Sequence, residues 1–488
     1  MYRIPSLDPL FPAAVDRTEK TVLLGAVLLF LVTVVAAVVT DRLWLLGLPA
    51  GLGFLYLLVQ NQNAALMVIV AAVPFSVEMS IGVGALQFPT EPMLLVLLGV
   101  WLLRSLLSPV SERRGATPMS KMDLFVWVFI GALGLSVLTT TIPLLSIKLF
   151  LNTCWYLGAF YFYPRRNLFK AEEMVRVLRW LFVATCGVVA FVVAQHSRYG
   201  FAGRGANISA YPFFLEHGSY AAHLGVVLGL AIGVSFGAVG RPRLRLLAII
   251  TALVTFIGTL FSYTRAAWVG VGLLLLFLFV TKAKEFLRFR TFMLVAVVAG
   301  LFSVVILSLG IQAALEKQMT SISDVETNLS NLERFNRWMA AVRIIEKHPL
   351  LGVGYGTYPV HYYTYHDRRL ETPVSDFYGF PHNDYLQFFA EAGIPGILSY
   401  LLLIGGLYWM GIRAYFRIRD PMKRNILLGC LAGVLTYLVH SFFNGFLQVD
   451  KVAVPFWMSM AFVATLIRDN QSGESAGPVQ ISGGRSQS

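Results

Sequence analysis

Residues 381–396 read PHNDYLQFFAEAGIPG, and this stretch holds both ends of a predicted helix. Proline favours the first position of a helix and glycine the residue just past its end, so a helix is predicted over 381–392, with Gly393 ending it and Pro395 starting another. One side of the first helix is apolar. The opposite side carries three polar residues spaced four apart: Asn383, Gln387 and Glu391.

His382 lies at the N-terminal mouth of this helix. The positive end of the helix dipole disfavours a second proton there, so the pKa of the imidazole is expected to be low enough to keep it neutral at physiological pH. A neutral imidazole can accept a proton or a hydrogen bond, which makes His382 a candidate base or anchor. A histidine that only caps or packs the start of the helix is the alternative.

The composition is typical of a membrane protein. Of 488 residues, 57% are hydrophobic and 13% charged, which leaves too little polar surface for a soluble globule. The net charge of +13 is carried by short Lys and Arg clusters between apolar runs, as in cytoplasmic loops, so no nucleic-acid partner is expected. The three cysteines lie far apart in apolar segments, which indicates neither a disulfide framework nor a thiolate metal site.

The apolar runs match the length that spans a bilayer. They predict an all-α polytopic integral membrane protein with 12–14 transmembrane helices and a large helical periplasmic loop before the last three spans. The candidate spans are 21–40, 43–60, 64–82, 90–107, 122–141, 146–163, 174–195, 217–239, 244–263, 266–281, 291–311, 396–416, 425–446 and 453–467.

Positive loops alternate with loops poor in Lys and Arg, which predicts that both termini are cytoplasmic. The family resemblance described below implies the bacterial inner membrane, with the active site facing the periplasm. The expected organisation is a cytoplasmic N-terminus at 1–20, a transmembrane bundle at 21–311, a periplasmic loop with amphipathic helices at 312–395, C-terminal transmembrane helices at 396–467 and a disordered cytoplasmic tail at 468–488.

The large loop contains two further patterns. Apolar residues recur at helical spacing over 331–347, among charges that include Arg334 and Arg337, so an amphipathic helix at the membrane surface is predicted. The segment 348–358 reads HPLLGVGYGTY, whose glycines predict a turn of unusual backbone freedom. A nucleotide loop is not indicated, because the segment lacks the Lys-Ser/Thr of a P-loop.

Arg265 stands at the outer junction of two long apolar runs. An arginine there is costly without an anionic partner, and its planar guanidinium suits two-pronged binding of phosphate oxygens. An arginine that snorkels to the interface is the alternative. Arg204, Arg334 and Arg337 could extend an anion site.

Aromatic residues between 355 and 380 could hold sugar rings or form an interfacial belt: Tyr355, Tyr358, Tyr362, Tyr363, Tyr365, Phe377, Tyr378 and Phe380. No histidine–carboxylate spacing supports a metal site. A neutral histidine beside an outward-facing arginine, at lipid level, points to group transfer from a lipid-linked phosphate donor.

The chain resembles a known family at this point. His382-Asn383, nine residues, then Gly393-Ile394-Pro395-Gly396 is similar to the His-[Asn/Ser/Gln]-x9-Gly-x-x-Gly signature of bacterial O-antigen ligases, in a superfamily shared with O-antigen polymerases and pilin-glycosylating oligosaccharyltransferases. An Arg-x-x-Trp segment at 265–268 and an Arg/Trp-containing helix running into HPLLGVGYGTY also resemble that superfamily. The resemblance covers 203 to the last span.

The resemblance implies an inverting, metal-independent glycosyltransferase without a cofactor. Its donor would be a glycan on undecaprenyl diphosphate, and its acceptor a hydroxyl of lipid A-core. By analogy Arg265 binds the diphosphate and His382 activates or positions the acceptor hydroxyl. The weaker candidates for substrate binding are Arg204, His217, Arg334, Arg337, Asn383 and Asp384.

Three other functions stay open. An O-antigen polymerase would use the same donor twice. A protein O-oligosaccharyltransferase is expected to carry a larger soluble C-terminal region than this tail. A non-enzymatic lipid-glycan transporter would survive the loss of a single base at His382, but the spans show few of the carboxylates that ion-coupled transport uses.

Overall fold

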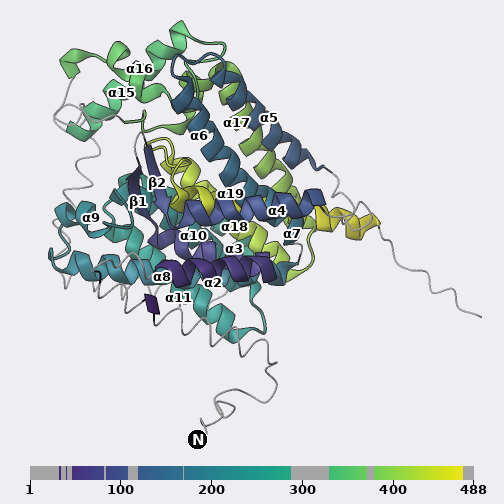
Figure 1. The fold of residues 1–488 in the computed structure, drawn as a ribbon. Coiled ribbons are helices and arrows are strands. Elements are labelled where there is room, and N and C mark those ends of the chain that lie inside the picture. Colours follow the sequence, from purple (N-terminus) through teal and green to yellow (C-terminus); the bar gives the residue numbers. More distant parts are fainter. Residues whose placement is uncertain are drawn as a thin grey trace, which may run out of the picture. The chain divides into compact units, whose positions relative to one another are not determined.

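The computed structural model describes residues 47–81, 84–107, 119–168, 170–286, 329–370 and 379–475, together with 32, 33 and 40. It is mostly helical (Figure 1), and eight of the described helices are long and apolar enough to cross a membrane. The expectation of a polytopic helical membrane protein is therefore confirmed. The span predicted at 291–311, most of that at 21–40, and Phe377 and Tyr378 lie outside the described residues.

The eight candidate spans all lie beyond residue 89. They are α4 (Thr90–Leu107), α8 (Ala171–Ser197), α10 (His217–Gly237), α11 (Pro242–Phe261), α12 (Arg265–Phe286, candidate span Arg265–Lys282), α17 (Asp384–Arg417), α18 (Pro421–His440) and α19 (Asp450–Ser475, candidate span Asp450–Asn470). α19 thus continues past 467, the expected end of the last span.

The chain divides into two compact units, Met1–Leu66 and Met67–Ser488. The described part of the first unit contains α2 (Gly47–Gln60). α3 (Gln62–Ala72) begins at its end. The second unit also contains the shorter elements η3 (Val73–Phe75), β1 (Val77–Ile81), β2 (Gly84–Phe88), α5 (Lys121–Val137), α6 (Pro143–Leu157), the π-helix η4 (Gly158–Phe162), α7 (Tyr163–Asn167), α9 (Gly203–Ser209), α15 (Leu329–Lys347), α16 (Tyr358–Tyr365) and η5 (Arg368–Leu370).

The span predicted at 64–82 is wrong in its second half. The helix ends at Ala72, and β1 and β2 then form an antiparallel hairpin in which Val77 pairs with Phe88 and Ile81 with Gly84. Apolar residues alternate with Glu78 and Ser80 in β1, which is the period of a strand. A hydropathy average over the whole run hides this alternation.

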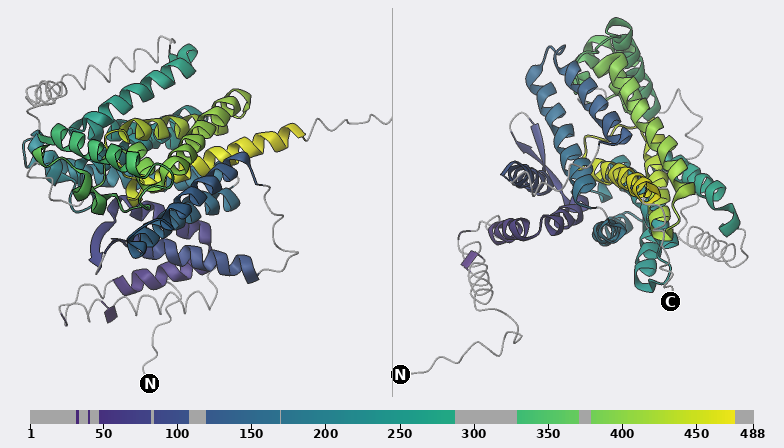
Figure 2. Two further views of the ribbon diagram at one scale, coloured as in Figure 1. Left: turned by 90° about the horizontal axis from the view of Figure 1, so that it is seen from above. Right: turned by 90° about the vertical axis from the view of Figure 1, so that its right-hand side faces the viewer.

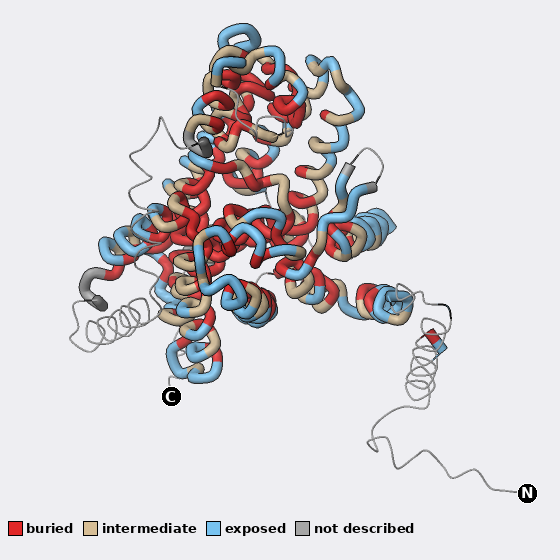
Figure 3. Tube along the Cα trace, turned by 90° about the vertical axis from the view of Figure 1, so that its left-hand side faces the viewer, coloured by how far each residue is buried: buried red, intermediate tan, exposed pale blue. Residues whose placement is uncertain are grey.

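The core of the second unit is formed by α10, α18 and α19, most of whose residues are buried. Figure 3 marks the buried residues in red. α10 and α18 cross at glycines: a side chain on Gly229 would collide with the backbone of Gly433, and one on Gly233 with the backbone of Asn425 and Gly429. Small residues let two helix backbones approach closely in a membrane, where packing rather than the hydrophobic effect holds helices together. Figure 2 shows α19 (yellow) between α5–α6 (blue) and α17–α18.

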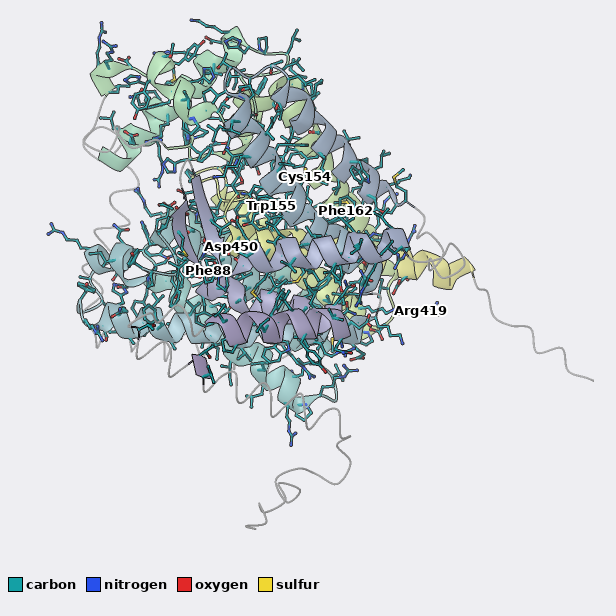
Figure 4. All side chains as sticks on the ribbon, viewed as in Figure 1. Phe88, Cys154, Trp155, Phe162, Arg419 and Asp450 are labelled. Carbon is teal, nitrogen blue, oxygen red and sulfur yellow. The ribbon has the colours of Figure 1, made fainter. Side chains whose placement is uncertain are left out.

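Two charged residues at the start of α19 are fully enclosed. The Lys451 ammonium donates to Asp450 at 3.0 Å and to the side-chain oxygen of Gln87 at 2.9 Å. Asp450 also accepts from Ser76 and, at 2.7 Å, from Thr90, so the residues on either side of the hairpin are held to α19. Figure 4 labels Asp450 beside the strands. The small number of acidic residues in the spans gave no indication of this network of buried charges.

α17 contains the break that the sequence predicts. Gly393 has φ 63° and ψ −158°, a backbone conformation open essentially to glycine alone, and Pro395 follows it. At this break the amide of Ile394 donates to the carbonyl of Pro349 at 2.9 Å, and Val353 donates to Ala390 at 3.1 Å. The glycine-rich turn after α15 therefore packs directly on α17.

Gly393→Ala is expected to destabilise the fold strongly. The backbone conformation alone costs about 1–3 kcal/mol for a residue with a side chain. An added Cβ would also collide with the carbonyl of Leu350. Thermal unfolding of the purified protein measures the loss. Gly405→Ala is the control, because Gly405 also lies in α17 and has no atom within 4 Å of an added Cβ; equal unfolding temperatures for the two variants would contradict the prediction.

Candidate active site

His382 immediately precedes α17 and has a left-handed backbone with φ 52°. Two neighbouring contacts hold it there. The Arg337 guanidinium donates to the carbonyl of Phe380 at 3.2 Å, and the Asn383 amide donates to the carbonyl of Phe442 at 3.1 Å. The left-handed region disfavours most side chains, so this conformation is imposed by the two flanking segments rather than by local preference.

The imidazole of His382 is neutral. Burial lowers its pKa to about 3, and the charges of Arg337 and Arg334 act in the same direction. The direction agrees with the sequence prediction. The dominant cause is burial, not the helix dipole, because enclosing a group in protein penalises its charged form.

Arg334 acts on His382, and a second arginine from a distant segment, Arg265, acts on Arg334. Burial and the nearby charge of Arg265 both lower the pKa of Arg334, while Glu216 raises it. Arg265 begins α12, and Arg334 lies in the first half of α15. Among the described residues, no hydrogen bond or salt bridge connects the guanidinium of Arg334 to another side chain. Two positive charges close enough to act on each other form a cationic cluster that favours an anion.

Glu216 is the carboxylate of this group, and it directly precedes α10. Burial raises its pKa, and Arg334 partly offsets that rise. The residue nevertheless has an exposed surface. Solvent therefore reaches this carboxylate.

His217 supports the segment that leads into Arg265. Its Nδ1 lies 2.8 Å from the carbonyl oxygen of Ser262 and 3.0 Å from the hydroxyl of Thr264. A carbonyl only accepts, so Nδ1 carries the proton and Nε2 is left as an acceptor. The ring therefore fixes the junction of α11 and α12 and keeps one nitrogen available.

Arg337 has a different environment from Arg334. It is buried, its Nε donates to Glu333 at 2.6 Å, and its guanidinium lies 5.1 Å from the ring centre of Tyr362. A side chain on Gly379 would collide with it. These contacts give Arg337 a structural role: it holds the loop that carries His382 in place.

Asn383 and Asp384 make contacts within the protein. The Asn383 side chain caps α17 by accepting from the amide of Leu386 at 3.0 Å. Asp384 is buried and accepts from the hydroxyl of Tyr437. Arg204 is exposed on α9. The structure therefore brings together His382, Arg265, Arg334, His217 and Arg337, and it gives Asn383 and Asp384 partners in the fold.

Comparison with known families adds one finding. Residues 249–401 match the family model described as O-antigen ligase. The chain carries an O-antigen ligase family domain. The matched segment runs from α11 into α17 and includes Arg265, Arg334, Arg337 and His382. No curated protein matches the chain.

Two groups near the site were not predicted from the sequence. Glu216 follows no motif, and its only signal is its position directly before His217. His440 ends α18, and both Arg334 and His217 act on it electrostatically. Its Nδ1 is buried without a hydrogen-bond partner among the described residues. Nothing in the local sequence distinguishes it, because its neighbours come from other helices.

The aromatic residues of the ligase domain divide into two sets. Tyr355, Tyr358 and Tyr362 are almost fully buried, so these three contact neither sugar nor lipid and serve as core. The hydroxyl of Tyr358 donates to the carbonyl of Arg337 at 2.7 Å, which connects α16 to α15. Tyr363 is partly exposed. The sugar and belt interpretations therefore apply only to the remainder of the predicted set.

Arg334→Gln is expected to lose activity, whereas Arg337→Gln is expected to lose stability. Loss of Arg334 should lower kcat/KM roughly 10- to 100-fold, the value of one charge-assisted contact, with little effect on unfolding. Loss of Arg337 removes one side of a buried ion pair with Glu333, which should destabilise the fold by about 3–5 kcal/mol. Transfer rates and thermal unfolding of both purified variants test this. A normal unfolding temperature for Arg337→Gln would contradict the structural role assigned to Arg337.

Proposed function

We propose that the protein is an O-antigen ligase. It transfers a glycan from undecaprenyl diphosphate to a hydroxyl of lipid A-core on the periplasmic side of the inner membrane, with inversion at the anomeric carbon and without a metal. The observation that carries the proposal is that Arg265 acts on Arg334, and Arg334 on the neutral imidazole of His382. One part of this site suits a phosphate and the other suits a hydroxyl.

The two arginines bind the donor. Guanidinium groups present paired N–H donors to phosphate oxygens, and they stay charged even where burial lowers their pKa. Negative charge grows on the diphosphate as its bond to the sugar breaks. Arginines held in place before the reaction stabilise that charge more in the transition state than in the ground state, which is what accelerates the step.

The acceptor hydroxyl lies against His382. Its oxygen forms a bond to the anomeric carbon while the bond from that carbon to the diphosphate oxygen breaks, and undecaprenyl diphosphate leaves. The imidazole accepts a hydrogen bond from the hydroxyl and directs its lone pair. Because a group with a pKa of about 3 is a weak base, the imidazole does not retain the proton, which passes to solvent on the acceptor side, opposite to the departing diphosphate. His382 thus orients the nucleophile.

The placement of the site supports the proposed side of the membrane. The start of α17 and the end of α18 meet close to His382, since Asp384 donates its amide to the carbonyl of Ser441. The opposite end of α17 reaches Arg417, and Arg413, Arg419, Lys423 and Arg424 lie in the same region. Positive residues favour the cytoplasmic side, so the site end faces the periplasm.

The test uses a strain that lacks its own ligase and makes both carrier-linked glycan and lipid A-core. Expression of this protein should yield lipopolysaccharide capped with long glycan and should deplete the undecaprenyl-linked pool. Longer carrier-linked chains with lipid A-core untouched would identify a polymerase instead. Glycan on protein would identify an oligosaccharyltransferase, and glycan moved across the membrane without new linkage a transporter.

The pH dependence of transfer follows from the neutral imidazole. An ordinary histidine protonates near its usual pKa of 6.5, whereas His382 stays neutral until the pH approaches about 3. Since the pKa is lowered, the acceptor form persists as the pH falls. We therefore expect kcat/KM to show no loss from this group between roughly pH 7.5 and pH 5.5. An acid limb centred near the ordinary histidine value, and absent in His382→Asn, would contradict this.

A further inference from the structure

An apolar groove opens between α11 and α12. It has a volume of about 200 Å³ and is lined by Phe256, Thr259 and Leu260 of α11 and by Trp268, Val271 and Gly272 of α12. Its one polar fixture is satisfied, because the indole N–H of Trp268 donates to the carbonyl of Thr259 at 3.1 Å. The groove therefore presents carbon surface.

The groove continues from the anion site along one helix. Arg265, Trp268, Gly272 and Leu275 are spaced three, four and three residues apart, so they lie on one face of α12. Arg265 stands at one end of this stripe, and Leu275 also lines the groove. The lined part from Trp268 to Leu275 is about 10 Å long at the rise of an α-helix. A guanidinium that binds phosphate thus stands at the head of an apolar channel.

We propose that this groove binds the first isoprene units of the donor lipid, with the diphosphate on Arg265 and Arg334. This inference rests on the proposed function, since it concerns the tail of the same donor. The occupant follows from continuity: a polyprenyl diphosphate joins an anion directly to a branched apolar chain, and the site joins a cationic cluster directly to an apolar groove.

The groove acts on specificity and placement more than on gross affinity. The surrounding bilayer is as apolar as the groove, so moving a chain from lipid into protein gains no hydrophobic free energy. The gain is close contact between atoms, which depends on shape. A chain seated beside Trp268 also fixes the direction of the diphosphate at Arg265, and this orientation lowers the barrier for the transfer step.

Gly272→Leu tests the groove with little risk to the fold. Gly272 is exposed, lies inside a helix and has no atom within 4 Å of an added Cβ, so a leucine there extends into the groove without collision. Gly405→Leu is the matched control, since Gly405 is also exposed, helical and open. Neither residue contacts the reacting groups, and leucine favours helices over glycine.

Two measurements on purified full-length protein separate binding from turnover. The first is photo-crosslinking of an undecaprenyl diphosphate analogue without glycan, carrying a diazirine in the second isoprene unit from the diphosphate, which the single-isoprene donor lacks. The second is transfer from two donors with the same glycan, one on undecaprenyl diphosphate and one on a diphosphate with a single isoprene unit. The first needs no activity, so it reports on the groove independently of the reaction.

In wild type and Gly405→Leu, crosslinks should map to α11 and α12. Gly272→Leu should lose them, raise KM for the undecaprenyl donor about tenfold or more, and leave transfer from the single-isoprene donor unchanged. Unaltered crosslinks or an unaltered KM in Gly272→Leu would overturn the groove assignment and leave the ligase proposal intact. Equal losses with both donors would also overturn it, because they would show an effect through Arg265. Absence of transfer in wild type alongside α11 and α12 crosslinks would overturn the ligase proposal alone.

Discussion

His382→Ala is expected to abolish capped lipopolysaccharide while the protein still inserts in the membrane at normal levels. Removal of a group that engages the reacting proton or hydroxyl typically lowers the rate about 10²- to 10⁴-fold. The imidazole makes no contact that stabilises α17, because the cap of that helix is Asn383. Carrier-linked glycan should therefore accumulate in the variant, visible on a gel beside unreacted lipid A-core.

His382→Asn is the informative companion. Asparagine tolerates a left-handed backbone better than most residues, so the loop with φ 52° should be kept. Its amide oxygen accepts a hydrogen bond but not a proton at physiological pH. If His382 orients the hydroxyl, His382→Asn should retain more kcat than His382→Ala. Equal loss in the two variants would contradict the anchoring role, and a wild-type ladder from His382→Ala would contradict the site.

Lys451→Met is expected to have the largest effect on stability. It removes the partner of Asp450 from a network in which both side chains are almost fully buried. Breaking a buried ion pair from one side costs about 3–5 kcal/mol, because it leaves a charge without compensation. Lower membrane yield and a lower thermal unfolding temperature should follow, although Lys451 is remote in sequence from the catalytic motif.

A double-mutant cycle with Asp450→Asn gives the sharper test. Loss of both charges should destabilise less than the sum of the two single variants, since neither charge is then left alone. Lys423→Met is the control, because Lys423 pairs with Asp469 at 3.2 Å at a partly exposed position. Such pairs contribute at most about 1 kcal/mol. A Lys451→Met variant as stable as Lys423→Met would show that the network is unimportant for the fold.

Features encoded in neighbouring residues could be predicted from the sequence. The helix over 381–392, its break at Gly393 and the helix over 331–347 all follow from local spacing. The structure has α15 at Leu329–Lys347 and α17 broken at Gly393, but α17 begins at Asp384, three residues later than predicted, because Asn383 rather than a residue before Pro381 caps it. Features made by distant residues could not. Asp450 meets Ser76 and Thr90 across more than 300 positions, and no local pattern records that pairing.

The same distinction, between features of neighbouring residues and features made by distant ones, applies to the candidate site. Arg265 stands out because it lies between two long apolar runs, and His382 because it opens a recognisable motif. Arg334 and Arg337 look equivalent in sequence, yet the structure pairs Arg337 with Glu333 and places Arg334 near Arg265. The difference arises from which segment packs against each guanidinium. Glu216 was missed for the same reason, since its role depends on a charge more than 100 residues away.

The unusual backbone of His382 affects when the entropy of the reactive loop is lost. A residue in this conformation would relax to an ordinary one if Arg337 released Phe380 or if Asn383 released Phe442. Folding itself therefore immobilises the imidazole, before any substrate arrives. The conformational entropy cost of about 1–2 kcal/mol per backbone residue arises when the protein folds, so it does not reduce the affinity each time a lipid-linked glycan binds. Such a site accepts a large, flexible sugar chain without having to organise itself around it.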